Sequence, residues 1–231
     1  MQRRAEPELM DDAAQARAYA EADFEQPHNQ FIAQFQRCFA RQPISGCVLD
    51  LGCGPCDITR RFALAYPDVT LHAVDGAAHM LRLGAEMLSR TGLAARITLL
   101  PARLPHEALP RTGYDAVISN SLLHHLDDPQ TLWQSITRYA RPGAPVFIMD
   151  LTRPDNTAAA RALMEQYAAN EPEILRQDFY NSLCAAYRSE EIAAQLKTAG
   201  LGHLNIETIS DRHFIAHGFM TRPAPTILCK F

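Results

Sequence analysis

The stretch from Cys47 to Thr59, CVLDLGCGPCDIT, constrains the fold more than any other part of the sequence. A short apolar run ends at Asp50, glycines stand at positions 52 and 54, and an amphipathic segment opens at Cys56. This order predicts a buried strand, a tight glycine turn and the N-terminus of a helix. Such a βα unit is typical of an open α/β sheet, which binds ligands at the carboxyl ends of its strands.

Two kinds of ligand suit a glycine turn that leads into a helix N-terminus. A dinucleotide-binding turn reads G-x-G-x-x-G, and its third glycine position falls on Asp57 here. A carboxylate at that position repels a pyrophosphate at close range, so NAD is disfavoured. The run DLGCGP at 50–55 instead resembles the first motif of class I S-adenosylmethionine (SAM)-dependent methyltransferases. That motif usually reads D-x-G-C-G-P-G, and Cys56 stands where its last glycine is usual.

The resemblance covers roughly residues 46–217 and implies an α/β, Rossmann-like open sheet. The sheet is mostly parallel with a C-terminal antiparallel strand pair, and helices cover both of its faces. The resemblance also implies that SAM is the cofactor and that its methyl group goes to a small-molecule acceptor. We expect one methyltransferase domain over residues 1–231, in four parts: an N-terminal helical arm (1–42), a cofactor-binding core (43–150), a helical insertion that covers the substrate (151–188), and a closing helix and strand pair (189–231).

The second expected strand, 69–74, ends at Asp75, and Gly76 follows it. An acid at this strand end faces the ligand groove and can accept hydrogen bonds from both hydroxyls of a ribose. Its structural alternative is a helix cap. After the third expected strand, 97–100, many relatives carry an acid that contacts the adenine amino group. Here Ala102 and Arg103 stand in that region, so we expect backbone groups to bind the adenine edge.

The fourth expected strand, 114–119, runs into the sequence NSLLHHL at 120–126. This segment resembles its counterpart in small-molecule methyltransferases, where L-H-H-L is common, and not the N-P-P-Y segment used on amide and adenine amines. A lone histidine is more often structural, but one that follows a central parallel strand can face the groove. His124 is therefore a candidate base for an acceptor that arrives protonated. The resemblance implies these cofactor-binding residues: Asp50, Gly52, Cys53, Gly54, Asp75, Gly76, Met80, Ala102, Arg103, Asn120 and Ser121.

Two segments outside the core are candidates for enclosing the acceptor. Residues 7–40 are expected to be helical, and in the resembled family such arms fold over the cofactor; plain packing on the sheet is the alternative. Residues 155–188 are long for one crossover, and an insertion above the strand ends suits a substrate cover. Asp150, at the end of the fifth strand, is a candidate for substrate contact. The other candidates are Tyr19, His28, His125, Arg153, for which a loop-edge salt bridge is the alternative, and Tyr180.

Residues 189–231 contain clear signals for the ends of a helix and of two strands. Ser189 is expected to cap a helix over 190–199, which Gly200 ends. Two strands are expected at 204–210 and 213–217. Pro223 and Pro225 cannot donate to a strand ladder and argue against a longer last strand.

Cys53 and Cys56 also permit a different reading, because a thioredoxin-type redox pair lies between a strand and a helix too. The surrounding glycines and Asp75 favour the cofactor turn. A helix N-terminus stabilises a thiolate, so mild oxidation is expected to bridge the two sulfurs and lower SAM affinity. Another alternative is a SAM-binding protein that modifies SAM itself or has a regulatory role. The sequence has no second CxxC and no HExxH, so no metal is expected.

The charge, the lack of long apolar runs and the cysteine content limit which partners and which compartment we expect. The net charge is −4 and no basic stripe is present, which argues against nucleic acid. No apolar run is long enough to cross a bilayer, and MQRRAEPELMDD lacks the apolar core of a signal peptide. Six cysteines without a secretion signal indicate reduced thiols. We therefore expect a cytoplasmic protein with no membrane partner, and a homodimer is left open.

Overall fold

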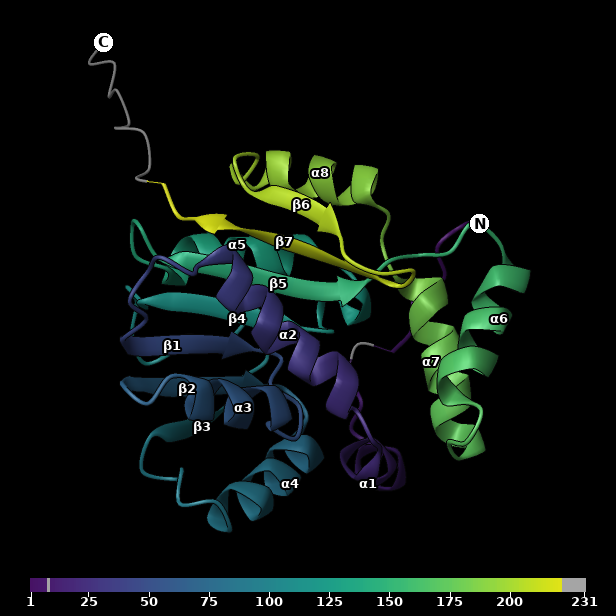
Figure 1. Cartoon of the computed structure of the whole chain (residues 1–231), viewed down its shortest axis with the longest axis horizontal. Coiled ribbons are helices and arrows are strands. Elements are labelled where there is room, and N and C mark those ends of the chain that lie inside the picture. The colour runs from purple at the N-terminus through teal and green to yellow at the C-terminus, as the bar shows by residue number, and fades with distance from the viewer. Residues whose placement is uncertain (8, 222–231) are drawn as a thin grey trace.

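The computed structural model of the chain describes residues 1–7 and 9–221. Within this part, seven strands form one sheet. Their bounds are β1 (Gly46–Leu51), β2 (Val69–Asp75), β3 (Ile97–Pro101), β4 (Ala116–Asn120), β5 (Pro145–Leu151), β6 (Asn205–Thr208) and β7 (His213–Phe219). The order is β3-β2-β1-β4-β5-β7-β6, with β1 to β5 parallel and β7 antiparallel to both of its neighbours. This is the predicted sheet, including its closing antiparallel pair (Figure 1).

Helices cover both faces of the sheet, as predicted. Their bounds are α1 (Ala13–Glu21), α2 (Glu25–Cys38), α3 (Asp57–Ala65), α4 (Ala78–Ser89), the short 3-10 helix η1 (Leu123–His125), α5 (Gln130–Tyr139), α6 (Thr157–Ala168), α7 (Glu173–Ala185) and α8 (Ser189–Thr198). Side chains of α2, α3 and α4 share one hydrophobic core, and side chains of α5 and α8 share another. Because both faces are covered, β1 is buried at every position after Gly46.

Aromatic side chains of α2 hold that helix over the middle of the sheet. Phe31 and Phe35 are fully buried, and both pack edge-on against Phe147 of β5. Phe35 also packs edge-on against Phe62 of α3, with ring centroids 4.8 Å apart. Edge-to-face pairs of this kind add to the free energy gained by burying the rings. The helix is therefore held firmly where the chain enters the cofactor core.

The N-terminal arm is less helical than predicted. Residues 1–7 and 9–12 form no helix, and α1 begins only after Asp12, whose carboxylate accepts hydrogen bonds from the amides of Ala14 and Gln15. The chain then breaks at residues 22–24 before α2. The first residues instead cross the carboxyl ends of the strands. The Arg4 amide donates to Cys184 O at 3.0 Å, in α7, and Asp11 bonds His79 of α4.

The insertion after β5 forms the helical pair α6 and α7, which lies beyond the carboxyl ends of the strands together with α1 (Figure 1). A hydrogen bond of 2.9 Å from the Gln15 side chain to Asp178 ties α1 to α7. At the next helix the expected cap is wrong. Ser189 is the first residue of α8, and Glu191 satisfies the helix start by accepting from the Arg188 amide at 2.7 Å.

Two remaining expectations concern the ends of the chain and the membrane. Pro223 and Pro225 lie outside the described residues. None of the helices that the structure describes combines the length and the apolar character needed to span a bilayer.

Candidate functional site

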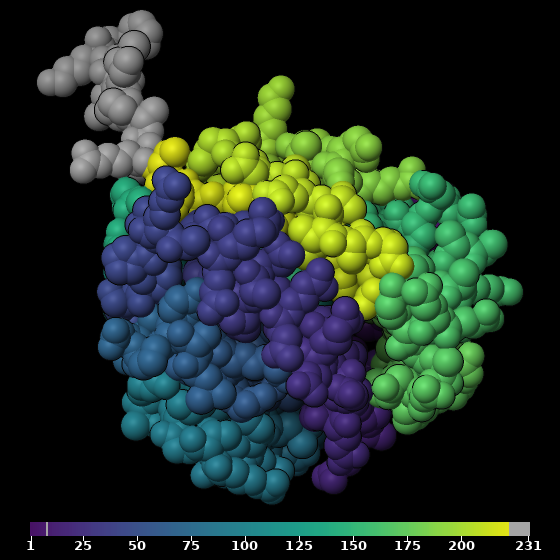
Figure 2. Space-filling view, in the orientation of Figure 1, coloured from purple at the N-terminus to yellow at the C-terminus, as the bar shows by residue number. Residues whose placement is uncertain are grey.

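A pocket of about 730 Å³ opens where β1, β2 and β4 end. Gly52, Asp75 and Asn120 line it from these three strand ends, and Tyr19 of α1 lines it from the opposite side. Figure 2 shows the purple surface of the N-terminal helices lying between the blue and teal surface of the β1–β3 half and the green surface of α6 and α7. The pocket therefore lies at the predicted edge of the sheet and beneath the predicted arm.

The glycine turn after β1 is held by backbone hydrogen bonds. Gly52 and Gly54 both have positive φ, +72° and +51°, which favours glycine. A Cβ at Gly52 would lie 2.8 Å from the Leu122 side chain, so this position also has no room for a larger residue. The amides of Gly52 and Cys53 donate to Val74 O at 2.8 and 3.0 Å. These bonds fasten the turn to the end of β2.

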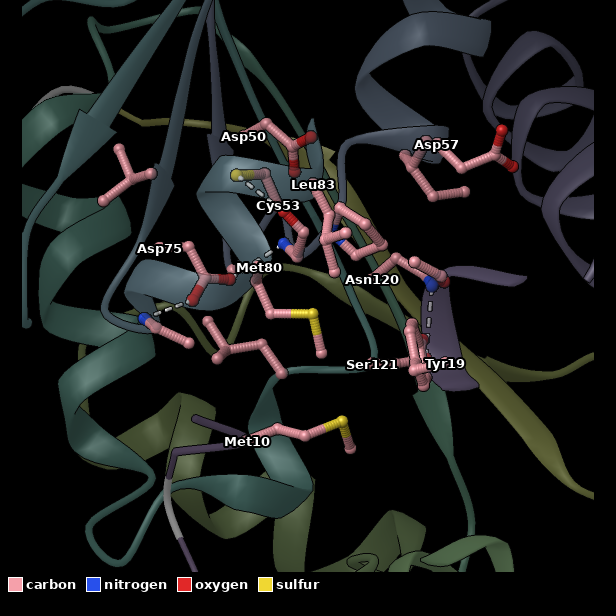
Figure 3. Close-up of a pocket in the computed structure, with 18 of the residues that line it drawn as sticks. Met10, Tyr19, Asp50, Cys53, Asp57, Asp75, Met80, Leu83, Asn120 and Ser121 are labelled. Atoms are coloured by element: carbon pink, nitrogen blue, oxygen red, sulfur yellow. Dashed lines mark hydrogen bonds between the residues drawn. The ribbon is translucent and has the colours of Figure 1, made fainter. Parts of the chain in front are cut away.

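Asp75 connects this turn to the next loop. One carboxylate oxygen accepts from the Gly54 amide and the other from the Ala77 amide, each at 2.8 Å. Burial raises the pKa of Asp75, and the amide hydrogen bonds oppose that shift. Figure 3 shows Asp75 and Met80 on one side of the pocket and Asn120, Ser121 and Tyr19 on the other. The carboxylate therefore serves both expected roles in part: it satisfies backbone amides near a helix start, and it faces the pocket.

Cys56, which stands where the usual motif has a glycine, has a backbone conformation that favours glycine. Its φ is +68°, in the left-handed region that side chains rarely adopt. Its side chain is fully buried and points at α4. There Gly84 provides the space, because a Cβ at Gly84 would lie 2.7 Å from the Cys56 sulfur. The absence of a side chain at Gly84 thus makes room for the side chain at Cys56, where the motif usually has glycine.

The burial of this turn argues against a reactive thiol at Cys53, and the effect of oxidation on SAM affinity stays a prediction. The sulfurs of Cys53 and Cys56 lie 3.8 Å apart, but both residues are buried. Burial and then the hydrogen bond from Cys56 raise the pKa of the Cys53 thiol well above its usual range. A buried thiol with a raised pKa forms little thiolate, so the helix N-terminus does not dominate here.

The predicted cofactor residues all lie in one place. Each of the eleven lines the pocket: Asp50, Gly52, Cys53, Gly54, Asp75, Gly76, Met80, Ala102, Arg103, Asn120 and Ser121. Glu107, four residues beyond Arg103, accepts from the Arg103 amide at 2.6 Å, so an acid does lie next to the loop where none was expected. That these residues contact SAM stays a prediction.

Asp57 lines the pocket, but its charge is balanced. Its carboxylate accepts from His28 at 2.7 Å, Arg61 at 2.6 Å and Arg60 at 2.8 Å. Burial opposes ionisation of Asp57, but these hydrogen bonds outweigh it and hold the pKa of the carboxyl well below its usual range. The expected repulsion of a pyrophosphate is therefore weaker than the sequence suggested. His28 lines the pocket as predicted, with one ring nitrogen bonded to Asp57.

The structure does not place His124 in the pocket. The ring is buried behind it, with Nδ1 2.5 Å from Asp150 and Nε2 3.6 Å from Glu6. Burial alone would lower the pKa of His124, and the charges of Asp150 and Glu6 reverse the shift. Asp150 also accepts from the Leu123 amide at 2.7 Å and is buried, so it does not face an acceptor. Of the two adjacent histidines, His125 lines the pocket.

Two other substrate candidates also lie outside the lining. Arg153 is buried and donates to Ala186 O at 2.9 Å and to Glu191 at 2.8 Å, which matches the salt-bridge alternative. Tyr180 packs in a small apolar cluster beneath α6 and α7. Tyr19 does line the pocket, and burial raises the pKa of its phenol to about 12. It therefore keeps its proton and remains a hydrogen-bond donor.

Several other lining residues were not predicted. Leu9 and Met10 come from the non-helical N-terminal segment; Leu9 lies against Gly76, and Met10 packs in one cluster with Ala77 and Met80. Leu122 and Leu126, which flank η1, add apolar lining near His125. No local motif marks Leu9 or Met10, because the segment has neither helical nor strand periodicity before it packs.

Comparison with known proteins agrees with this geometry. A family model described as a methyltransferase domain matches residues 49–146. Residues 49–146 form a methyltransferase domain. An uncharacterized methyltransferase of Mycobacterium tuberculosis (strain ATCC 25618 / H37Rv) is 35% identical over 108 residues, 47% of this chain and 52% of the relative. A trans-aconitate 2-methyltransferase of Azoarcus sp. (strain BH72) is 31% identical over 111 residues, 47% of this chain and 41% of the relative.

The match over residues 49–146 bears out the predicted family for that part of the chain, and the chain spans about half the length of the curated relatives it matches. Solved structures match a larger part of the chain than residues 49–146. A SAM-dependent methyltransferase from Aquifex aeolicus superposes with a TM-score of 0.62 at 16% identity, over 89% of this chain and 97% of its own. The plantazolicin methyltransferase BpumL, solved in complex with a triazolic desmethylPZN analogue and S-adenosylhomocysteine (SAH), superposes with a TM-score of 0.68 at 14% identity, over 91% of this chain and 92% of its own. Both show that the fold is that of SAM-dependent methyltransferases.

Proposed function

We propose that this chain is an enzyme that transfers a methyl group from SAM to a small-molecule acceptor. One observation carries the proposal: the methyltransferase domain holds Asp75 and the amides of its glycine turn together at the pocket. Names of relatives support the acceptor class, because one family of them is called trans-aconitate 2-methyltransferase.

The residues present suit SAM. Asp75 has lone pairs left beyond its two amide bonds, which ribose hydroxyls can occupy. Met80 and Ala102 offer apolar walls for an adenine, and the turn at 52–54 lies beside Asn120 at the neighbouring strand end. Asp50 lies beneath that turn, where it accepts from Thr59 at 2.6 Å. We assign the remaining predicted cofactor residues to this same end of the pocket.

Bound SAM supplies an electrophilic methyl group on its sulfonium. The protein then has to align the acceptor with that methyl and exclude water. Leu122 and Leu126 offer an apolar surface for the acceptor, and the Tyr19 phenol can donate a hydrogen bond to it. We assign the acceptor to this end of the pocket. We also assign the protein to the cytoplasm.

The arm and the insertion are proposed to enclose the acceptor. Support comes from the bond between Gln15 and Asp178, which joins the two segments across the strand ends. Amide hydrogen exchange in residues 13–21 and 173–185 should slow when SAH and acceptor are both bound. Unchanged exchange in both helices would mean that they are fixed scaffold.

Labelled methyl transfer tests the proposal. The chain would be incubated with SAM labelled on its methyl group and with a small-molecule extract, and label would then be sought in new low-mass compounds. The parent should transfer label, and Asp75→Ala should transfer at least about tenfold less at limiting SAM. Tight SAM binding without any transfer would favour the alternative of a protein that binds SAM for another purpose.

A further inference from the structure

Three metal-ligating side chains meet behind the acceptor end of the pocket. They are Glu6 from the N-terminal segment and the adjacent His124 and His125 of η1. One Glu6 carboxylate oxygen, Oε1, lies 3.1 Å from His125 Nδ1 and 3.6 Å from His124 Nε2. The three donor atoms all lie within 4.8 Å of one another, and the side chains are 11%, 3% and 17% exposed.

Each of the three side chains also has a neighbour that orients it. Asp150 lies 2.5 Å from His124 Nδ1, which leaves Nε2 facing Glu6. Ser182 of α7 donates at 3.0 Å to Glu6 Oε1, the oxygen that faces the histidines. His125 bonds the Pro7 backbone. Carboxylate, hydroxyl and carbonyl partners of this kind are what orient the ligands in metal sites.

One atom of the cluster lacks a hydrogen bond in the described part of the chain. His125 Nδ1 is buried, and its position relative to Glu6 does not give hydrogen-bond geometry. The His124 Nε2 to Glu6 distance of 3.6 Å is also too long for a hydrogen bond. A buried polar atom without a partner costs free energy, so the arrangement calls for a group between these atoms.

We propose that Glu6, His124 and His125 bind one divalent transition-metal ion, with Zn²⁺ as the best match. Ligand atoms about 2.0–2.1 Å from a tetrahedral Zn²⁺ lie roughly 3.4 Å apart, between the two distances found here. Imidazole nitrogens suit Zn²⁺, and its two charges balance Glu6 and Asp150. Three protein ligands leave a fourth position open, as in catalytic zinc sites. Since His125 lines the pocket, the ion adjoins the acceptor end.

The N-terminal segment is anchored independently of the ion. Arg3 donates to the carbonyls of Ala185, His124 and Leu126 and lies over the Tyr187 ring. These contacts place Glu6 beside the histidines before any metal binds. The site could not be predicted from the sequence, because Glu6 lies far from the histidine pair along the chain and no metal motif joins them.

A second group, Cys38, Glu207 and His217, is a poorer match and serves as a control. Both Glu207 oxygens are already engaged, one by His217 at 2.6 Å and the other by Arg37 at 2.7 Å. The Arg37 guanidinium next to this carboxylate repels a cation. Neither its carboxylate nor its histidine is therefore free to ligate.

Metal titration of the tag-free full chain tests the proposal. After stripping with a chelator, the parent should take up one Zn²⁺ per chain, and Co²⁺ in its place should show the visible absorption of a low-symmetry site without a sulfur-to-cobalt band. Glu6→Gln keeps the shape of the side chain and should weaken Zn²⁺ binding at least tenfold. Zn²⁺ should raise the melting temperature of the parent and not that of the variant.

The matched control is the pair of substitutions Cys38→Ser and His217→Gln, which removes the second group and should leave Zn²⁺ affinity within about twofold of the parent. Near-ultraviolet circular dichroism checks that Glu6→Gln is folded, and His125→Asn provides a second variant with the same expected loss. Absence of stoichiometric Zn²⁺ binding by the parent would overturn the proposal. So would binding that survives Glu6→Gln and His125→Asn, or that disappears in the control.

Discussion

The two ends of the pocket are built in different ways. The cofactor end, residues 52–54 and 75–76, comes from loops that follow two adjacent strands, and its hydrogen bonds join backbone amides to one carboxylate. The acceptor end lies beside the N-terminal segment, η1 and α7, and side chains from distant parts of the chain hold these three together. Backbone geometry defines the first end, whereas tertiary packing defines the second.

The difference explains what each end tolerates. A turn set by glycine conformations and amide bonds depends on a few residues that cannot be exchanged, such as Gly52, whose Cβ would meet Leu122. The acceptor end has no comparable backbone requirement, so its side chains can vary with the acceptor while the sheet stays the same. Substitutions at the two ends should therefore have separable effects.

The largest effect is expected from Asp75→Ala at the cofactor end. Removing the carboxylate should weaken SAM binding by about 1.5–3 kcal/mol, roughly 10- to 150-fold in Kd, because hydrogen bonds to a charged group are lost. Stability should fall as well, since the amides of Gly54 and Ala77 lose their acceptor. Calorimetry on the folded protein measures the affinity. Asp68→Ala, an exposed acid just before the opposite end of β2, is the matched control. Equal SAM affinity in parent and Asp75→Ala would reduce Asp75 to a structural role.

The second test concerns the contact between Cys56 in the turn and Gly84 in α4. Gly84→Ala should lower the free energy of unfolding by about 1–3 kcal/mol, because the new methyl group would meet the Cys56 sulfur. In a Cys56→Gly background the same substitution should instead raise it by about 0.5–1 kcal/mol, the usual gain of alanine over glycine in a helix. Urea denaturation of the four proteins completes the cycle. If Gly84→Ala acts equally in both backgrounds, the two residues do not compensate for each other.

The third test concerns the pH dependence of stability at Asp50. Burial raises the pKa of this carboxyl to about 7, so the folded protein holds the proton more tightly than the unfolded chain does. Asp50 therefore contributes most to the free energy of unfolding below about pH 4, the pKa of an aspartate in the unfolded chain. That contribution is lost as the pH rises to about 7, at up to about 1.4 kcal/mol per pH unit.

Asp50→Asn removes this titration while keeping an acceptor for the Thr59 hydroxyl. The difference in unfolding free energy between variant and parent should grow from pH 4 to pH 7 in favour of the variant. Asp68→Asn, on the surface, should show no such trend. A difference that is constant over this range would mean that Asp50 is ionised throughout.

The sequence predicts the two ends unequally well, for the same physical reason. Strand, turn and helix signals around Asp50 and Asp75 are local, so the mostly parallel sheet and the pocket position of all eleven cofactor candidates could be predicted from the sequence. The sequence does not reveal which of His124 and His125 bonds Asp150, so the prediction of His124 at the pocket is wrong. Glu6 and Met10 could not be found, because they enter the site only through the packing of a segment without periodicity.

Calorimetric titration with SAM, SAH and NAD tests the central claim most directly. The cofactor end should bind SAM and SAH at one site per chain with similar, micromolar affinity, because Asp75 and the turn amides recognise the part that the two molecules share. NAD should bind more weakly than SAM, because Asp57 stands at the third glycine position of a dinucleotide turn, even though His28, Arg60 and Arg61 balance its charge. NAD binding more tightly than SAM would contradict the account.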